Sequence, residues 1–289
     1  MIKGICVAVC TVFDKNTEAL NEAGHLRHVD RMLEAGVHAI AVCGGTGEYA
    51  QMDEAERRKV IAITAKHIEG KAQLVVHASA IRTKDAVESA KYAEGHGASG
   101  ILILPSIFEG AEEEGVFKFY EAIGNAVKTP IIAYNTPANS GFDITPEYYK
   151  RLTSNIPNIQ YIKDSSGDFM RIEQLVAQGA QVLNGCDYFS LYSLMAGAVG
   201  CFWGGANCMP KQGVKLYDLV LAGKLAEANE LWKTMKAAQM FFWSNHYNSS
   251  VKAATNIMGF EVGECRLPVV PLKAEKVEEL KNTLALLAK

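Results

Sequence analysis

The sequence lacks the features that mark several large classes of protein. It has no apolar run of about 18 residues, which argues against a membrane-spanning helix. Its start, MIKGICVAVC, lacks the long apolar region and small-residue cleavage site of a signal peptide. The formal net charge of -3 gives no basic excess, which argues against nucleic acid and anionic membranes as partners. We therefore expect a cytoplasmic protein that binds small molecules.

Cysteine and histidine are present, but not in the patterns that form disulfides or bind metals. The seven cysteines are an odd number and include no C-x-x-C pair. Four of them lie in apolar runs, where a free cysteine behaves as a small hydrophobe: Cys6, Cys10, Cys43 and Cys201. His25 and His28 are close in sequence, but no cysteine or carboxylate cluster at metal-ligand spacing joins them. We expect free thiols in a reducing compartment and no metal site.

Short β-rich runs recur along the chain. They are GICVAV (4–9), VHAIAVC (37–43), AQLVVHA (72–78), SGILIL (99–104), PIIAYN (130–135), IQYIKD (159–164), QVLNG (181–185) and VGCFW (199–203). Segments with helical composition separate them. Asp53 suits the N-cap of one helix, and Thr83 suits the N-cap of the next, which Gly95 or Gly97 would end.

Apolar strands that alternate with helices indicate a parallel sheet covered on both faces. Eight such units favour a (β/α)₈ TIM barrel, because a doubly wound open sheet more often has five or six strands and a G-x-G-x-x-G turn after the first, which is missing here. We expect residues 1–222 to form the barrel and residues 223–289 to form a C-terminal helical extension of the same domain.

The extension begins with an amphipathic helix. Its apolar stripe consists of Ala228, Leu231, Trp232, Met235, Ala238 and Phe242. Such a stripe predicts packing against the outer ring of the barrel or against a neighbouring subunit. Two further helices are expected at 248–259 and 273–288.

In such a barrel the active site lies at the C-terminal ends of the strands. Three polar stretches fall there: Gly44-Gly45-Thr46-Gly47-Glu48 after the second run, Tyr134-Asn135-Thr136-Pro137 at the fifth, and Lys163-Asp164-Ser165-Ser166-Gly167 at the sixth. These stretches are the candidates for chemistry.

Lys163 ends an apolar strand, and alternation predicts that Ile159, Tyr161 and Lys163 share one strand face. A lysine that faces the barrel mouth is partly desolvated, which favours the neutral amine that can form a Schiff base with a ketone. The alternative is a lysine that extends to the surface and forms a salt bridge. Spacing alone leaves both possibilities open.

Tyr134 has the same parity as Ile132 and is expected to face inward, where a phenol could transfer protons. The glycine-rich loop at 44–48 could present backbone N–H groups to a carboxylate or a phosphate. Taken singly, each favours a structural role instead, as a rim tyrosine whose hydroxyl finds a partner and as a tight turn without a ligand.

Taken together, G-x-T-G-E, Y-N-x-P and I-K-D at these three strand ends resemble the dihydrodipicolinate synthase/N-acetylneuraminate lyase family. The resemblance covers essentially the whole chain and includes Gly185, the stretch Ser250-Val251-Lys252-Ala253 and the stretch Arg266-Leu267-Pro268. It implies a (β/α)₈ barrel, usually a homotetramer. It also implies a lysine Schiff base with pyruvate or another 2-oxo acid and no separate cofactor.

The resemblance implies a role for each matching residue. Lys163 would form the imine, and Tyr134 would transfer protons. The backbone N–H groups of Gly45 and Thr46 would hold the pyruvoyl carboxylate, with the Thr46 hydroxyl near Tyr134. Further substrate contacts are expected from Asn139, Ser165, Gly185, Asp187, Phe202 and Trp203.

The chain also departs from the family's patterns. The lysine-biosynthetic synthases have two threonines where this chain has Gly45-Thr46, paired tyrosines at Ser106-Ile107, and an arginine at Asn139 that binds the second substrate's carboxylate. A lost charged bidentate contact is worth about 1.5 to 3 kcal/mol, which disfavours the synthase reaction. The sialic acid lyases have threonine at Ser165 and a small residue followed by serine at Trp203-Gly204, so an indole at the mouth would shorten the pocket.

We predict a metal-independent class I aldolase that uses pyruvate and an aldehyde and acts on a short 4-hydroxy-2-oxo acid. The stretches 137–141 and 163–168 resemble the 4-hydroxy-2-oxoglutarate aldolase branch most closely, and 2-keto-3-deoxy sugar acids are the related candidates. Within the same chemistry, the alternatives are a Schiff-base dehydratase and a dihydrodipicolinate synthase. Outside it, they are a phosphate-binding barrel enzyme in which Lys163 is a counter-charge, and a ligand-sensing barrel without turnover.

Overall fold

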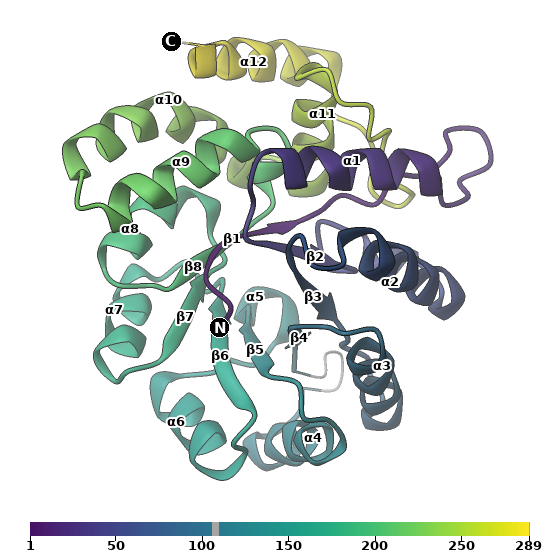
Figure 1. Cartoon of the computed structure of the whole chain (residues 1–289), viewed down its shortest axis with the longest axis vertical. Coiled ribbons are helices and arrows are strands. Elements are labelled where there is room, and N and C mark those ends of the chain that lie inside the picture. The colour runs from purple at the N-terminus through teal and green to yellow at the C-terminus, as the bar shows by residue number, and fades with distance from the viewer. Residues whose placement is uncertain (106–109, 289) are drawn as a thin grey trace.

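The computed structural model describes residues 1–105 and 110–288, and within these ranges eight parallel strands close into a barrel. The strands are β1 (Gly4–Ala8), β2 (Ala39–Val42), β3 (Gln73–His77), β4 (Gly100–Ile103), β5 (Ile131–Asn135), β6 (Ile159–Asp164), β7 (Gln181–Asn184) and β8 (Gly200–Trp203). Each strand pairs with the next, and β8 pairs with β1. Figure 1 shows the strands at the centre of a ring of helices, which confirms the predicted (β/α)₈ barrel.

Helices connect the strands and cover the barrel. They are α1 (Glu22–Glu34), α2 (Glu54–Ile68), α3 (Thr83–Gly95), α4 (Glu113–Ala126), α5 (Pro137–Ser140), α6 (Pro146–Asn155), α7 (Phe169–Ala177), α8 (Ser190–Met195), α9 (Pro210–Leu221), α10 (Leu225–Ser244), α11 (Tyr247–Ile257) and α12 (Ala274–Leu284). Single 3₁₀ turns occur at η1 (Tyr49–Gln51), η2 (Asp187–Phe189), η3 (Gly205–Asn207) and η4 (Ala285–Ala288).

The helix boundaries follow local capping chemistry. Asp53 caps α2 as expected, because its side chain accepts a hydrogen bond from Glu56 N at 2.8 Å and Glu56 bonds back to the Asp53 backbone. The prediction that Thr83 is an N-cap is wrong by one residue. Thr83 is the first helical residue, and Arg82, which makes no side-chain capping bond, precedes it. The helix ends at Gly95, and Gly97 turns the chain with φ +74°.

Side chains alternate between two apolar layers. The inner layer fills the barrel and is formed by Ile2, Cys6, Ala8, Ala39, Ala41, Val75, Leu102, Ile132, Tyr161, Leu183 and Phe202. The larger outer layer lies between the strands and the helices. A barrel interior packed in this way leaves a ligand only the rim.

Strand β6 departs from strict alternation. Ile131 pairs with Ile159, but the next residue, Ile132, pairs with Tyr161, so Gln160 is an extra, exposed residue in β6. The prediction that Ile159 shares a face with Tyr161 and Lys163 is therefore wrong. The bulge turns Ile159 into the outer layer, while Tyr161 lies in the inner layer.

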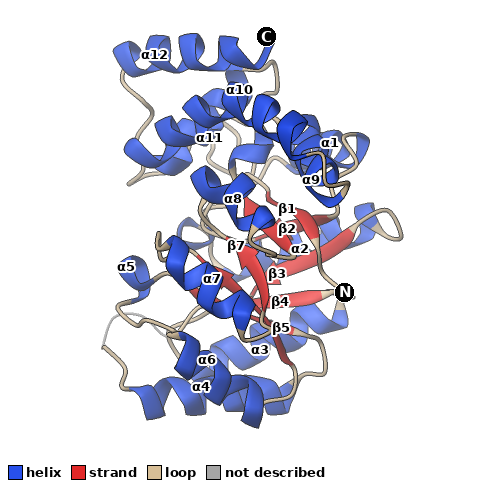
Figure 2. Cartoon of the chain, turned by 90° about the vertical axis from the view of Figure 1, so that its left-hand side faces the viewer, coloured by secondary structure: helices blue, strands red, loops and turns tan. Residues whose placement is uncertain are grey.

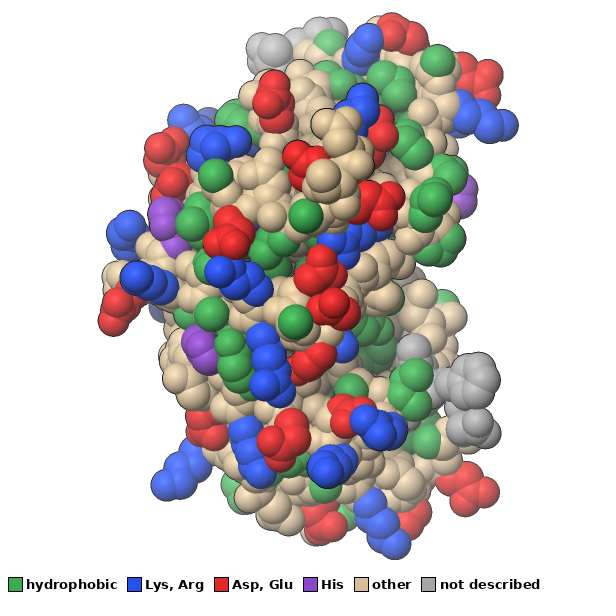
Figure 3. All heavy atoms as spheres, turned by 90° about the vertical axis from the view of Figure 1, so that its right-hand side faces the viewer, with side chains coloured by type: hydrophobic (Ala, Val, Ile, Leu, Met, Phe, Trp, Pro, Cys, Tyr) green, Lys and Arg blue, Asp and Glu red, His purple; other side chains and the backbone are tan. Residues whose placement is uncertain are grey.

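The C-terminal helices lie on one side of the barrel, beyond α1 and α9, as Figure 1 and Figure 2 show. Helix α10 packs along α9, α11 and α12, and its apolar stripe is buried there except for the half-buried Leu231. The stripe thus packs against other helices of the same chain. Of the two expected partners, this agrees with the outer ring of the barrel and not with a neighbouring subunit. No helix in the described ranges is long and apolar enough to cross a membrane. Figure 3 shows charges of both signs interspersed on one face.

A buried histidine on α1 makes the fold sensitive to acid. His28 Nε2 lies 2.7 Å from Asn207 Oδ1, and because the Asn207 amide nitrogen donates to Ala8 O and Gly204 O, the histidine must donate at Nε2. Its Nδ1 is buried without a partner. Burial lowers the pKa of His28 to about 4.

We therefore expect the unfolding free energy to fall as the pH drops from about 6.5 towards 4. The unfolded chain binds this proton first, so His28 alone accounts for a loss of up to about 3 kcal/mol. In His28→Gln, which keeps a donor for Asn207, the loss should be smaller. Urea titrations at pH 7 and pH 4.5 measure both proteins, and identical pH dependence would contradict the assignment.

Candidate active site

The pairing of β5 with β6 brings two of the polar stretches together. Tyr134 pairs with Lys163, and Asn135 pairs with Asp164. Asn135 Nδ2 donates to Asp164 Oδ2 at 2.9 Å, and Ser165 N donates to Asn135 O at 2.8 Å. Burial raises the pKa of Asp164. These bonds hold the two strand ends in register, so that the phenol and the amine lie side by side.

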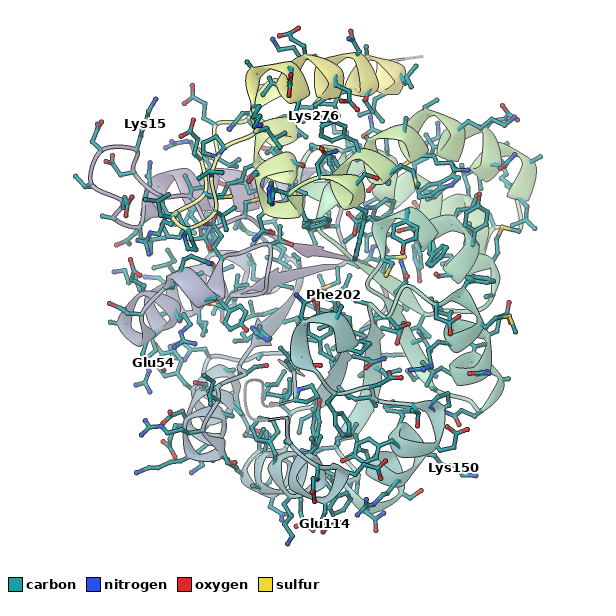
Figure 4. All side chains as sticks on the ribbon, turned by 180° about the vertical axis from the view of Figure 1, so that it is seen from behind. Lys15, Glu54, Glu114, Lys150, Phe202 and Lys276 are labelled. Carbon is teal, nitrogen blue, oxygen red and sulfur yellow. The ribbon has the colours of Figure 1, made fainter. Side chains whose placement is uncertain are left out.

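Lys163 is buried, with 8% of its surface exposed. Its Nζ lies 3.8 Å from the centre of the Tyr134 ring and 4.7 Å from the centre of the Phe202 ring. Among residues 1–105 and 110–288, none accepts a hydrogen bond from it or forms a salt bridge with it, so the contacts found for the amine are those with the two rings. The salt-bridge alternative for Lys163 thus finds no support. Figure 4 shows Phe202 near the middle of the ring of strands.

Gly185 makes room for the amine. A Cβ built on Gly185 would lie 3.0 Å from Lys163 Cε and 2.9 Å from Asp164 O, and still closer to Ser165 Oγ. The Ser165 hydroxyl is buried without a hydrogen-bond partner. Any side chain at position 185 would therefore displace Lys163 or Ser165, which explains the glycine at the end of β7.

The glycine-rich loop offers free donors at the same end of the barrel. Within the described chain, the N–H groups of Gly45 and Thr46 donate no hydrogen bond, and a Cβ on Gly45 would meet nothing within 4 Å. Thr11 Oγ1 donates to Gly47 O at 2.6 Å and holds the loop against the N-terminal segment. Two adjacent free amides beside open space form a suitable binding site for an anion.

A third cluster, from the C-terminal extension, borders Thr46. Tyr247 on α11 donates from its hydroxyl to Asp187 Oδ2 at 2.7 Å, and Gly205 N donates to the same oxygen at 2.9 Å. A Cβ on Gly204 would lie 2.9 Å from Thr46 Oγ1 and closer still to the Tyr247 hydroxyl. Thr46 and Tyr247 therefore flank Gly204. The expected contact between the Thr46 hydroxyl and Tyr134 is not a hydrogen bond in the described chain.

The charges of these groups act on one another. Burial raises the pKa of Asp187 to about 6, although the Tyr247 and Gly205 hydrogen bonds and the charge of Lys163 oppose the rise. Burial also raises the pKa of Tyr247 well above its usual value, with further contributions from Asp187 and Tyr134. One Asp187 oxygen, Oδ1, is buried without a partner. The cluster therefore combines an acid that titrates near neutral pH with a phenol that stays protonated.

His77 ends β3 and was not recognised from the sequence. Its Nδ1 donates to Cys43 O at 2.8 Å, which leaves Nε2 as a buried acceptor without a partner. Burial lowers its pKa to about 3, and the charge of Lys163 contributes. The rule that strand ends carry the site would have selected His77. Tyr247 had no comparable signal, because it reaches the mouth from a helix distant in sequence.

The predicted substrate contact at Asn139 lies on the helix that directly follows the end of β5. Asn139 is exposed on α5, and its Oδ1 accepts a hydrogen bond from Thr136 Oγ1 at 2.9 Å. Ser106 and Ile107, which replace the paired tyrosines, lie outside the described residues. No group of three His, Cys, Asp or Glu residues suited to a metal ion occurs in the part of the chain that the structure describes.

The prediction that Trp203 lines the mouth and shortens the pocket is wrong. Trp203 is fully buried in the outer layer, and its Nε1 donates to Gln239 Oε1 on α10 at 3.0 Å. Alternation along β8 explains this, because Phe202 faces the interior and the next residue must face the helices. The aromatic ring near Lys163 is that of Phe202.

A cavity of about 790 Å³ adjoins the site without including Lys163. Tyr49, whose ring lies edge-on to His77 at 4.4 Å, forms part of its wall. Its charged lining consists of Arg57, Arg58, Arg82, Glu54, Asp85 and Glu88. Among the described lining residues the two signs balance, so these side chains give the cavity no clear preference for an anion.

The opposite orientations of Phe202 and Trp203 can be tested by a matched pair of variants. Trp203→Phe should lower the unfolding free energy by about 1 to 3 kcal/mol, because it leaves the buried Gln239 amide without its donor. It should leave binding at the mouth unchanged. Phe202→Leu removes a ring beside Lys163 and should change ligand binding. Denaturant titration and ligand titration of both variants measure this, and a binding defect in Trp203→Phe would contradict the assignment.

Replacement of Asp187 tests its raised pKa. The pKa of Asp187 is about 6 in the folded chain and lower in the unfolded chain. The protonated acid therefore stabilises the folded state below the unfolded pKa, and this stabilisation is lost as the pH rises through about 6. Asp187→Asn should therefore gain stability relative to the parent between pH 4 and pH 7, by up to about 3 kcal/mol. Urea titrations at both pH values measure it. A difference that does not change with pH would contradict it.

The chain is similar to curated proteins over its full length. It is 32% identical over 290 residues to the 4-hydroxy-tetrahydrodipicolinate synthase of Thermotoga sp. (strain RQ2), covering 98% of each chain. It is 33% identical over 285 residues to the enzyme of the same name from Geotalea uraniireducens, covering 96% of each. Its fold matches the crystal structure of dihydrodipicolinate synthase from Thermotoga maritima with TM-score 0.94 and 30% identity, over 100% of this chain and 99% of that one.

The family model for the dihydrodipicolinate synthetase family matches residues 1–287. Members of this family are carbon–carbon lyases that form a covalent lysine Schiff base with pyruvate and use no external cofactor. The free amide donors, the buried amine and the adjacent phenol at the mouth of this barrel agree with that chemistry. The chain therefore belongs to the dihydrodipicolinate synthetase family.

Proposed function

We propose that Lys163 forms an imine with pyruvate. The resulting enamine is joined to an aldehyde in synthesis, and in cleavage the same enamine forms when the bond to the aldehyde carbon breaks. The observation that carries this proposal is the placement of Lys163 Nζ, 3.8 Å from the Tyr134 ring and without a salt bridge to any described residue. An amine held in this way is available to attack a ketone. The free N–H groups of Gly45 and Thr46 would bind the pyruvoyl carboxylate.

Lys163 and Tyr134 supply the groups that the steps of this reaction require. Lys163 attacks the ketone carbon, and loss of water leaves a protonated imine that withdraws electrons from the neighbouring carbon. In cleavage, Tyr134 takes the proton of the C4 hydroxyl, the C3–C4 bond breaks, and its electrons form the enamine. Protonation and hydrolysis of the enamine release pyruvate. Synthesis is the same sequence in reverse, with Tyr134 donating a proton to the new alkoxide.

The relatives favour the synthase direction. Those named above are 4-hydroxy-tetrahydrodipicolinate synthases at 32% and 33% identity. That product has seven carbons, of which pyruvate supplies three, so the partner would be a four-carbon amino-acid aldehyde, aspartate semialdehyde. These names support synthesis better than they support our sequence-based prediction of a 4-hydroxy-2-oxo acid aldolase.

The aldolase stays as a second candidate because of Asn139. Position 139 carries a neutral amide that is exposed and hydrogen-bonded to Thr136, where the lysine-biosynthetic synthases are expected to have an arginine for the partner's carboxylate. A partner without a second carboxylate suits this position better. A 2-keto-3-deoxy sugar acid is such a substrate, whereas 4-hydroxy-2-oxoglutarate has the second carboxylate. A dehydratase that uses the same imine would be recognised by loss of water without release of an aldehyde.

The imine itself is the first test. Incubation with pyruvate followed by borohydride should add the mass of one reduced pyruvate per chain, measured on the intact protein and mapped to the peptide that contains Lys163. Lys163→Ala should lose the adduct, since it removes the nucleophile. Lys150→Ala, an exposed lysine on α6, is the matched control and should keep it.

Absence of an adduct at saturating pyruvate, from a folded protein, would contradict the proposal and favour the phosphate-binding alternative. Given an adduct, two assays then assign the partner. Formation of the cyclic product from pyruvate and aspartate semialdehyde would support the synthase. Release of pyruvate from 4-hydroxy-2-oxo acids, without that synthesis, would support the aldolase.

Three further expectations stay predictions. The family resemblance predicts a homotetramer and a cytoplasmic enzyme. The division into a barrel over 1–222 and a helical extension over 223–289 of one domain is supported by the packing of α10 along α9.

A further inference from the structure

A buried ion pair joins the glycine-rich loop to the C-terminal extension. Lys252 on α11 and Glu48 at the end of the loop are separated by more than 200 residues of sequence, yet Nζ and Oε1 lie 2.5 Å apart. The two side chains are 2% and 0% exposed. Water therefore screens neither charge, and each depends on the other.

The remaining atoms of the pair are held by the extension. Lys252 Nζ donates to Glu264 O at 2.9 Å, and Glu48 Oε2 accepts from Arg266 N at 2.8 Å. Glu48 Oε1 accepts no hydrogen bond, so its compensation is the charge of Lys252. Removal of Lys252 would leave a buried carboxylate oxygen without a hydrogen bond and without its ion-pair partner.

The backbone transmits this anchoring to the anion site. Glu48 has the left-handed φ of +59°, and its N–H donates to Gly45 O at 3.0 Å, which closes the loop on itself. From the same helix as Lys252, Asn248 Nδ2 donates to Gly45 O at 2.8 Å. A change in the position of Glu48 or α11 must therefore move Gly45, and with it the peptide that carries the Thr46 N–H.

We propose that Lys252 is a positioning residue that, through Glu48, holds the free N–H groups of Gly45 and Thr46 in the orientation that binds the carboxylate of a 2-oxo acid. This inference rests on the proposed imine chemistry and adds that the C-terminal extension is part of the binding site. Buried ion pairs contribute little net stability, and apolar replacements are often neutral. A positional role therefore accounts for the pair better than stability does.

The test removes both charges together and avoids an unpaired buried ion. Glu48→Gln combined with Lys252→Met keeps an acceptor for Arg266 N and a long side chain at position 252. The half-saturating pyruvate concentration for borohydride trapping should rise by about tenfold to a hundredfold, because small displacements of binding groups have effects of this size. The adduct at saturation should stay at one per chain. Glu230→Gln with Lys233→Met, an exposed pair on α10 at 2.7 Å, is the matched control and should not change trapping.

Acetone, a ketone without a carboxylate, separates positioning from general damage. Since it makes no use of the loop amides, its half-saturating concentration should change by no more than about twofold in the variant. An unchanged value for pyruvate in a folded variant would overturn the proposal. An equal loss for pyruvate and acetone would also overturn it, because the defect would then lie at Lys163 and not at the loop.

A second variant covers the case in which the paired variant does not fold. Asn248→Ala removes the other bond from α11 to the loop at a half-buried position. It should raise the half-saturating concentration of pyruvate and leave that of acetone unchanged. An unchanged half-saturating concentration of pyruvate would count against positioning by α11. The parent protein is trapped first. A parent without an adduct refutes the imine, whereas a parent with an adduct and insensitive variants refutes only the inference.

Discussion

The register between β5 and β6 is the constraint on which the rest of the site depends. One extra residue in β6, Gln160, shifts the pairing so that Tyr134 lies beside Lys163. A pairing shifted by one residue would turn the lysine out of the barrel, because side chains alternate between the two faces of a strand. The Asn135–Asp164 hydrogen bond, one residue further along, holds this register from the outer side.

The consequence is a buried lysine whose amine lies beside aromatic rings and forms no salt bridge with a carboxylate in the described chain. Lys163 lies between the rings of Tyr134 and Phe202. The charge of Lys163 acts on the pKa values of Asp187 and His77. At Asp187 it opposes the larger, upward effect of burial, and at His77 it adds to the larger, downward effect of burial. A salt bridge would stabilise the ammonium form and compete with chemistry at the amine.

The mouth of the barrel is completed by a helix outside the eight β/α units. Helix α11 supplies Tyr247 to Asp187, Asn248 to Gly45 and Lys252 to Glu48. The barrel places these partners at strand ends, but the helix determines how they are oriented. The extension therefore forms part of the wall of the site, although it follows the barrel in sequence.

Local sequence predicted the architecture, and the family resemblance added the pair Lys163 and Tyr134. Eight apolar runs separated by helical segments favoured a closed barrel, because strands buried on both faces indicate a covered parallel sheet and an open doubly wound sheet more often has five or six strands. The rule that barrel sites lie at strand ends selected the three stretches that contain Lys163, Tyr134, Gly45 and Thr46, and it would also have selected His77. The family resemblance then implied the role of each residue. The orientation of Trp203 was open to the same reasoning, because it follows from alternation with Phe202.

Only the tertiary structure decided the rest. The bulge at Gln160 depends on how two strands fit in the closed sheet, and no residue type in the sequence predicts it. Tyr247 and Lys252 reach the site through helix packing, and their partners Asp187 and Glu48 lie 60 and about 200 residues away in sequence, distances that periodicity cannot span. The sequence by itself determined which groups stand at the strand ends. Long-range packing decided which of them face one another, because contacts between distant segments form only when the whole barrel and its extension are assembled.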